Sequence, residues 1–197
     1  MTTITFDWNC VIAIENNEAA GDAVMKLVQL HREGRLHAAI TAVSASENLR
    51  GSRNFPADGN VFKERIANVD LSDLPLLPAP AYFGLSFFGM CYFQDEEKPI
   101  EPTIDSLWQI LGPCTPRMQD NIIEMNEIRA AGEAKWRNIW CDVHTLFVHI
   151  DNERDIFVTL NTKDFQRNHD KFARIAEFRA MTPDECLQEI LSTLPPV

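Results

Sequence analysis

The chain has 197 residues, 45% of them hydrophobic, so it is long enough for one well-buried core and short for two independent domains. We predict a single domain over residues 1–197 with an insertion at about 52–116. Eighteen basic against twenty-nine acidic residues give a formal net charge of −11, which argues against broad, non-specific binding to nucleic acid. Chemistry on a nucleic acid would therefore need a local basic rim or a metal ion.

The cysteines and the apolar stretches indicate the cellular setting. The five cysteines are scattered and include no C-x-x-C pair, which favours neither a zinc site nor a disulfide framework. No signal-like segment opens the sequence, and no apolar stretch reaches the roughly 18 residues that cross a bilayer. We therefore expect a cytoplasmic protein without a membrane partner.

The first elements alternate between strand and helix. The apolar run Ile4–Phe6 predicts a short buried strand that leads through Asp7 into the start of a helix. Apolar residues at helical spacing predict a second helix from about residue 17 to Arg32, and Gly34 follows at the place of a helix C-terminus.

A second strand continues this alternation. Residues 36–43 are rich in apolar and β-branched side chains and fit a buried strand. The following Ser44 and Glu47 have the spacing of a capping box, which predicts a helix with Ser44 as its N-cap. A β-α-β-α order is typical of a mostly parallel sheet that is covered on both faces.

The middle of the chain interrupts this order. Residues 51–116 hold eight of the eleven prolines and the aromatic, glycine-containing run Tyr82–Phe93. The prolines favour an extended connection, and the aromatic run favours a strand over a helix. The aromatic side chains fit core packing best, and the alternative is a surface for self-association or for a partner.

Regular elements return in the last third of the chain. Apolar periodicity predicts a pair of helices over residues 117–132 and 133–151. Residues 156–160 form a third core strand, and 161–165 leave its carboxyl end. Threonine, proline and two acids at 182–185 predict the start of a closing helix.

Four carboxylates follow or interrupt these apolar runs: Asp7, Glu47, Asp142 and Asp164. If the runs are neighbours in one sheet, the acids converge at its edge, where oxygen ligands can hold a divalent metal as in a nuclease. Each acid also has a local explanation. Asp7 and Asp164 fit turns, Glu47 fits the capping box, and Asp142 fits an exposed helix position.

Five motifs in chain order resemble the PIN-domain ribonuclease family, especially the toxins of bacterial toxin–antitoxin pairs. The motifs are Phe6-Asp7-Trp8-Asn9, residues 39–51, Trp140-Cys141-Asp142, residues 157–165 and residues 181–185. The resemblance covers about residues 4–51 and 133–187. It leaves the insertion without a counterpart.

The resemblance implies a fold and an activity. The fold would be a PIN-like, three-layer α/β/α domain with a mostly parallel central sheet and an inserted segment rich in proline and aromatic residues. The activity would be that of an endoribonuclease dependent on Mg²⁺ or Mn²⁺, with RNA as substrate, an antitoxin as partner and a homodimer as assembly. The alternative is a non-catalytic PIN-fold module that binds RNA or protein.

The resemblance also assigns roles to individual residues. It implies that the four acids are metal ligands and catalytic groups, supported by Asn9 and Asn161, and that Asn161 could take the place of Asp164. Thr41 could touch phosphate or water, although a strand position explains it as well. A basic rim for RNA could come from Arg50, Lys135 and Lys163, which fit solvated helix and turn charges too.

Overall fold

A central parallel sheet organises the molecule. The computed structural model describes residues 1–47, 59–82, 85–94, 99–115, 117 and 134–193. In this part of the chain the sheet has five strands, and every neighbouring pair runs parallel. Their spatial order is β3 (Leu76–Leu77), β2 (His37–Thr41), β1 (Thr3–Phe6), β6 (Ile156–Val158) and β7 (Arg179–Met181). The prediction of a mostly parallel sheet in an α/β fold is confirmed.

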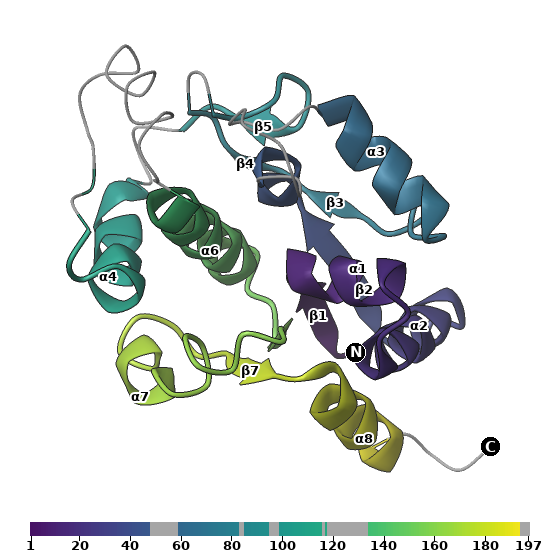
Figure 1. The fold of residues 1–197 in the computed structure, drawn as a ribbon. Coiled ribbons are helices and arrows are strands. Elements are labelled where there is room, and N and C mark those ends of the chain that lie inside the picture. Colours follow the sequence, from purple (N-terminus) through teal and green to yellow (C-terminus); the bar gives the residue numbers. More distant parts are fainter. Residues whose placement is uncertain (48–58, 83–84, 95–98, 116, 118–133, 194–197) are drawn as a thin grey trace.

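Helices pack on both faces of this sheet (Figure 1). Because side chains alternate along a strand, Ile4 and Phe6 enter one apolar cluster and Phe157 enters the other. The first cluster includes α1 (Trp8–Glu15), α2 (Ala19–Arg32), α3 (Gly59–Asn68) and α8 (Pro183–Thr193). The second includes α4 (Glu101–Leu111), α6 (Ala134–Asp151) and α7 (His169–Phe172). The short strands β4 (Ala79–Pro80) and β5 (Cys91–Tyr92) form a separate parallel pair.

Local sequence signals explain several element boundaries. Gly34 has φ +71° just after α2, a left-handed conformation that favours glycine. At the start of α8 the Thr182 N–H donates to Glu185 Oε2 at 2.8 Å, and the Glu185 N–H donates to Thr182 Oγ1 at 3.3 Å. This reciprocal capping box confirms the predicted start of the closing helix.

Gly21 allows α1 and α2 to approach closely. A Cβ atom added at Gly21 would lie 2.8 Å from the Ala13 carbonyl oxygen and 3.0 Å from Ile14 Cα, and both atoms belong to the backbone. We therefore expect Gly21→Ala to destabilise the fold by about 1–3 kcal/mol, although alanine is the better helix former. Urea unfolding measures the change. Ala20→Gly on the same helix is the matched control, and it should cost no more than about 1 kcal/mol. A neutral or stabilising Gly21→Ala variant would contradict the close packing.

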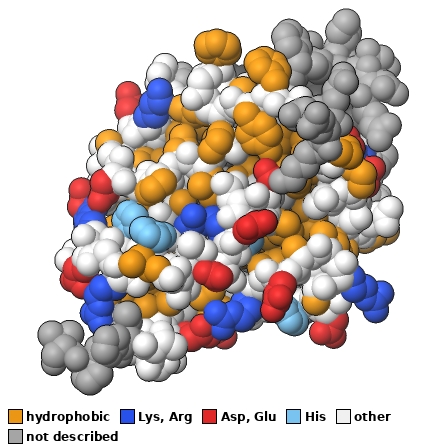
Figure 2. Space-filling model, turned by 180° about the vertical axis from the view of Figure 1, so that it is seen from behind, with side chains coloured by type: hydrophobic (Ala, Val, Ile, Leu, Met, Phe, Trp, Pro, Cys, Tyr) orange, Lys and Arg blue, Asp and Glu red, His pale blue; other side chains and the backbone are white. Residues whose placement is uncertain are grey.

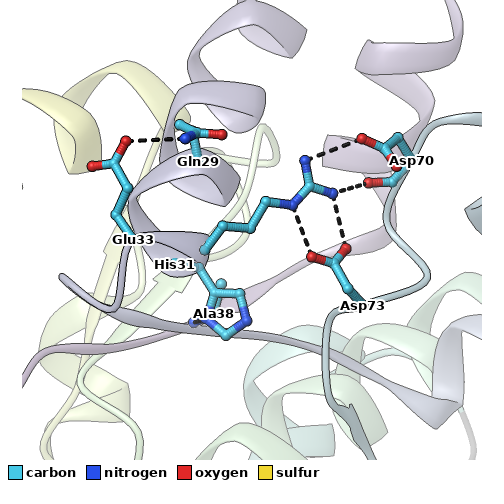
Figure 3. Close-up of polar contacts among 7 residues, drawn as sticks. Gln29, His31, Glu33, Ala38, Asp70 and Asp73 are labelled. Carbon is cyan, nitrogen blue, oxygen red and sulfur yellow. Dashed lines mark hydrogen bonds and ion pairs between the residues drawn. The ribbon is translucent and has the colours of Figure 1, made fainter.

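A guanidinium group ties the end of α2 to the chain that follows α3 (Figure 3). Arg32 donates to both carboxylate oxygens of Asp73 at 2.8 and 2.9 Å and to Asp70 Oδ2 at 3.1 Å. A further bond of 2.5 Å reaches the carbonyl oxygen of Asp70, whose φ of +57° turns the chain. The contacts are exposed, so they fix local geometry more than they stabilise the fold.

The segment predicted as an insertion takes part in the core. Its β3 pairs with β2, its α3 contributes Phe62 and Ile66 to one apolar cluster, and its α4 contributes Ile104 to the other. These side chains are 2%, 9% and 0% exposed. The described part of residues 52–116 is therefore integrated into the domain.

The aromatic run 82–93 is mostly not a strand, so that prediction was wrong. Among the described residues of the run, only Cys91–Tyr92 form a strand, and most of those before it lie in turns and bends, where Gly89 has φ +81°. Phe88 and Phe93 are 99% and 85% exposed, whereas Leu85 is 6% exposed. Figure 2 shows hydrophobic side chains gathered at the upper end of the face opposite that of Figure 1. Core packing and surface exposure thus apply to different residues of the run.

The helix predicted over residues 117–132 lies outside the described residues, apart from Arg117. Its predicted neighbour over 133–151 corresponds to α6. None of the helices in the described ranges is long and apolar enough to span a membrane.

His149 on α6 is completely buried against the sheet. Its Nδ1 lies 3.0 Å from Thr5 Oγ1, and its ring makes edge contacts with Phe157 and Phe178 at centroid distances of 5.5 and 5.3 Å. Its Nε2 atom has no hydrogen-bond partner among the described residues. The ring is therefore held as a neutral core side chain.

This burial makes stability depend on pH. Burial lowers the pKa of His149 to about 3; the charge of Arg154 adds to this shift and Asp155 opposes it. Between about pH 6.5 and 3 the unfolded chain binds a proton that the folded chain does not, so stability falls as the pH falls. We expect His149→Gln to reduce the slope of unfolding free energy against pH by about 1.4 kcal/mol per unit in this window. Urea titrations of both proteins measure it. Parallel curves below neutral pH would contradict the prediction.

Candidate metal centre

Asp7 lies where β1 ends and α1 begins. Its backbone is extended, with φ −71° and ψ 153°, and its Oδ1 accepts the Trp8 N–H at 2.8 Å as the N-cap of α1. The Asp7 N–H donates to the Val158 carbonyl oxygen at 2.9 Å, which joins this position to the end of β6. The acid is thus fixed at the carboxyl ends of two neighbouring strands, as predicted for it.

A polar network from α1 and from the segment that follows β6 orients the other oxygen of Asp7. Thr159 Oγ1 donates to Asp7 Oδ2 at 2.7 Å, and Asn9 Nδ2 donates to the same oxygen at 2.5 Å. Asn9 Oδ1 in turn accepts the Leu160 N–H at 3.0 Å, and Thr159 Oγ1 accepts the Asn161 N–H at 3.0 Å. Asn9 therefore supports Asp7, as expected. Thr159 does so as well, although only its motif was recognised from the sequence.

Three of the four predicted acids line one pocket of about 300 Å³. Asp7 comes from the end of β1, Glu47 from the end of η1 (Ala42–Ser46) and Asp142 from the middle of α6. Among the described residues, those that line it are Asp7, Asn9, Ile12, Glu47, Asn138, Cys141, Asp142 and Asn161. Residues more than 130 positions apart in the sequence thus meet at this edge of the sheet.

The acids of the pocket raise one another's pKa, because each negative charge disfavours ionisation of its neighbours. Burial raises the pKa of Glu47 well above its ordinary value, and the charges of Asp7 and Asp142 raise it further. Burial, followed by the charges of Asp7 and Asp164, likewise raises the pKa of Asp142 well above its ordinary value. Burial also raises the pKa of Asp7, although the hydrogen bonds from Thr159, Trp8 and Asn9 oppose the shift. A cation in the pocket would relieve this repulsion.

Asp164 and Asn161 occupy different positions around the pocket. Asn161 lines it, whereas Asp164 does not and instead accepts the Asn161 Nδ2 at 2.9 Å on its Oδ2. Asp164 still acts on the site, because its charge contributes to the raised pKa of Asp142. Asn161 thus lines the pocket, and Asp164 holds its amide from outside the lining.

The capping role predicted for Glu47 was wrong. Ser44 lies inside the 3₁₀ helix Ala42–Ser46, and Glu47 follows the end of this helix with its N–H donating to the Ser44 carbonyl oxygen at 3.3 Å. The Ser44 hydroxyl has no hydrogen-bond partner in the described part of the chain. The Glu47 carboxylate is thus available to the pocket.

The other predicted polar residues lie elsewhere. Thr41 is fully buried, with its Oγ1 3.4 Å from Thr145 Oγ1 of α6, and it does not line the pocket. Lys135 and Lys163 are exposed and are not among the lining residues. Arg50 lies outside the described residues.

Three residues near the pocket were not singled out from the sequence. Asn138 lies one helical turn before Asp142 on α6, so i, i+4 spacing could have found it. Cys141 is 4% exposed, and burial followed by the charges of Glu47, Asp142 and Asp7 raises the pKa of its thiol well above the ordinary value. Arg65 on α3 acts on Glu47 from within the predicted insertion, where no sequence signal marked it.

The donors of the pocket have the chemistry that Mg²⁺ or Mn²⁺ prefers, since carboxylate and amide oxygens are hard ligands. Within the described ranges, no three His, Cys, Asp or Glu side chains are grouped so that they could hold a metal ion as they stand. The pocket therefore supplies suitable donors without a preformed cage of three such side chains.

No family model matches the chain, and neither a curated protein nor a solved structure matches it.

Proposed function

We propose that the protein is a PIN-like endoribonuclease that hydrolyses RNA phosphodiester bonds with Mg²⁺ or Mn²⁺. The observation that carries this proposal is the meeting of Asp7, Glu47 and Asp142 in one pocket at the carboxyl end of a parallel sheet. Parallel α/β folds place their ligand sites at this end. The raised pKa values of the three acids support it, because like charges are gathered where a divalent cation would offset them.

The chain's own residues would share the work as follows. Asp7, Glu47 and Asp142 would hold the metal ion, which when bound polarises a phosphoryl oxygen and lowers the pKa of water. Asn9 and Thr159 keep the Asp7 carboxylate in one orientation through bonds of 2.5 and 2.7 Å. Because the carboxylate is already oriented, it does not have to move during the reaction.

The decisive experiment incubates the purified protein with structured RNA in Mg²⁺ or Mn²⁺, beside an EDTA control. Asp7→Asn removes one negative ligand, and we expect it to lower the cleavage rate by at least about a hundredfold. Asp22→Asn makes the same chemical change at an exposed position of α2 and should cut like wild type. Wild-type protein that cuts several RNAs no faster than Asp7→Asn would instead favour the non-catalytic interaction module.

An antitoxin partner and a homodimer follow only from the family resemblance, and both stay predictions. Co-purification with the product of the adjacent reading frame tests the first. A solution mass measurement tests the second.

A further inference from the structure

Arg65 on α3 lies against the face of α1 that reaches the acid pocket. Its Cζ atom is 4.8 Å from the centroid of the Trp8 ring, its Nε donates to Glu15 Oε1 at 2.6 Å, and a second nitrogen bonds Glu15 Oε2. Trp8, Ile12 and Glu15 follow the i, i+4, i+7 spacing of one helix face. Ile12 lies on this same face and lines the pocket, whereas Arg65 is outside the lining and packs on Trp8 and Glu15 of that face.

The charge of Arg65 reaches the pocket. It acts on the carboxylate of Glu47, which lines the pocket. The side chain is still 21% exposed, so it is open to a ligand from solvent. Its guanidinium is held by the Trp8 ring, over which it lies, and by Glu15, which reduces the entropy lost when it binds another group.

A polyanion such as RNA needs a cationic side chain near this pocket in order to bind there. The pocket gathers acids, and the whole chain carries a formal charge of −11. A phosphodiester strand at the pocket is repelled unless cations flank the metal-binding acids. Guanidinium is well suited to that role because its donors match two phosphate oxygens at once.

We infer that Arg65 is a substrate-binding residue that contacts an RNA phosphate adjoining the acid pocket. This inference rests on the proposed function. A purely structural role is the competing explanation, in which Arg65 only ties α3 to α1 through Glu15. The two roles differ in what the loss of Glu15 does. Phosphate binding survives the loss of Glu15 because Arg65 keeps its charge. A structural tie between α3 and α1 is lost whether Arg65 or Glu15 is replaced.

The test measures the binding of a short fluorescein-labelled single-stranded RNA by anisotropy, with Mg²⁺ present. An Asp7→Asn background prevents cleavage and also removes one repelling charge. In it we expect Arg65→Ala to weaken binding about tenfold, the size of one charge-assisted hydrogen bond. The slope of log affinity against log salt should fall by about 0.7, as for one phosphate contact on a single strand.

Lys63→Ala is the matched control. It removes the same charge from the same helix, but two residues along α3 place Lys63 on the opposite side, where it lines a pocket against Leu76 of β3. It should change affinity less than about twofold. Glu15→Gln removes a negative charge but also loosens the hold on Arg65, so it should weaken binding much less than Arg65→Ala does. Thermal unfolding verifies that each variant is folded.

The binding and cleavage results distinguish a failure of the Arg65–phosphate contact from a failure of the proposed ribonuclease function. If the parent binds RNA and Arg65→Ala behaves like Lys63→Ala, or if Glu15→Gln weakens binding as much as Arg65→Ala, the phosphate contact is overturned. If the protein with Asp7 intact neither binds nor cuts RNA, the proposed function fails and this inference fails with it. In the active protein, support requires that Arg65→Ala raise KM much more than it lowers kcat.

Discussion

Replacing Glu47 by glutamine is expected to stabilise the protein in metal-free buffer and to inactivate it. Burial and the charges of Asp7 and Asp142 disfavour the ionised carboxylate, so a neutral isostere removes unfavourable electrostatics from the folded state. The same change removes a proposed metal ligand, and we expect RNA cleavage to fall by at least about a hundredfold. Urea unfolding in EDTA and cleavage assays in Mg²⁺ measure the two effects.

Added Mg²⁺ should reverse the order of stability. Wild type gains stability from a cation that neutralises its three acids, whereas Glu47→Gln gains less. Glu64→Gln, at an exposed position of α3, is the control, and it should stay within about 0.5 kcal/mol of wild type in both buffers. A Glu47→Gln protein that is fully active, or less stable than wild type in EDTA, would contradict the metal centre proposed for this pocket.

The second large effect is expected at the centre of the core. Phe157 on β6 is 0% exposed and packs on His149 and Phe165 at centroid distances of 5.5 and 4.9 Å. Truncation to alanine removes these contacts and leaves a cavity between the sheet and α6, so we expect Phe157→Ala to cost about 3–5 kcal/mol. The midpoint of urea unfolding reports this cost.

Phe88→Ala is the matched truncation at a surface position. Phe88 is 99% exposed, and its loss should change the free energy of unfolding by no more than about 0.5 kcal/mol. Equal losses at both positions would mean that the ring of Phe88 is covered in solution. A small loss at Phe157 would contradict the packing of β6 against α6.

The elements that were predicted share strong, continuous signals. Strands β1, β2 and β6 are apolar runs because both of their faces are covered, and α2 and α6 repeat apolar residues at helical spacing. Asp7 was placed because the carboxyl ends of such strands meet at one edge, and Asp142 because its motif lies in the predicted helix over 133–151. Their convergence with Glu47 in one pocket agrees with that expectation.

The elements that were missed depend on tertiary contacts. Strand β7 has only three residues, none of them fully buried, and β3 has two residues between prolines, so neither shows a pattern of its own. The aromatic run was misread because exposed Phe88 precedes Gly89 in a turn, and composition alone does not distinguish an exposed ring from a buried one. Glu47 was assigned a capping partner by spacing, although its side chain belongs to a pocket formed with distant residues.

The pairing of β3 with β2 bears on how the chain can be shortened. A deletion variant that joins residue 47 directly to residue 134 would keep Asp7, Glu47 and Asp142 of the pocket. It would also remove β3, which pairs with the outer edge of β2, and residues 38–41 of β2 are all buried. An uncovered apolar strand edge templates pairing between molecules. We expect such a minimal domain to aggregate on expression, so studies of this pocket need the intact chain.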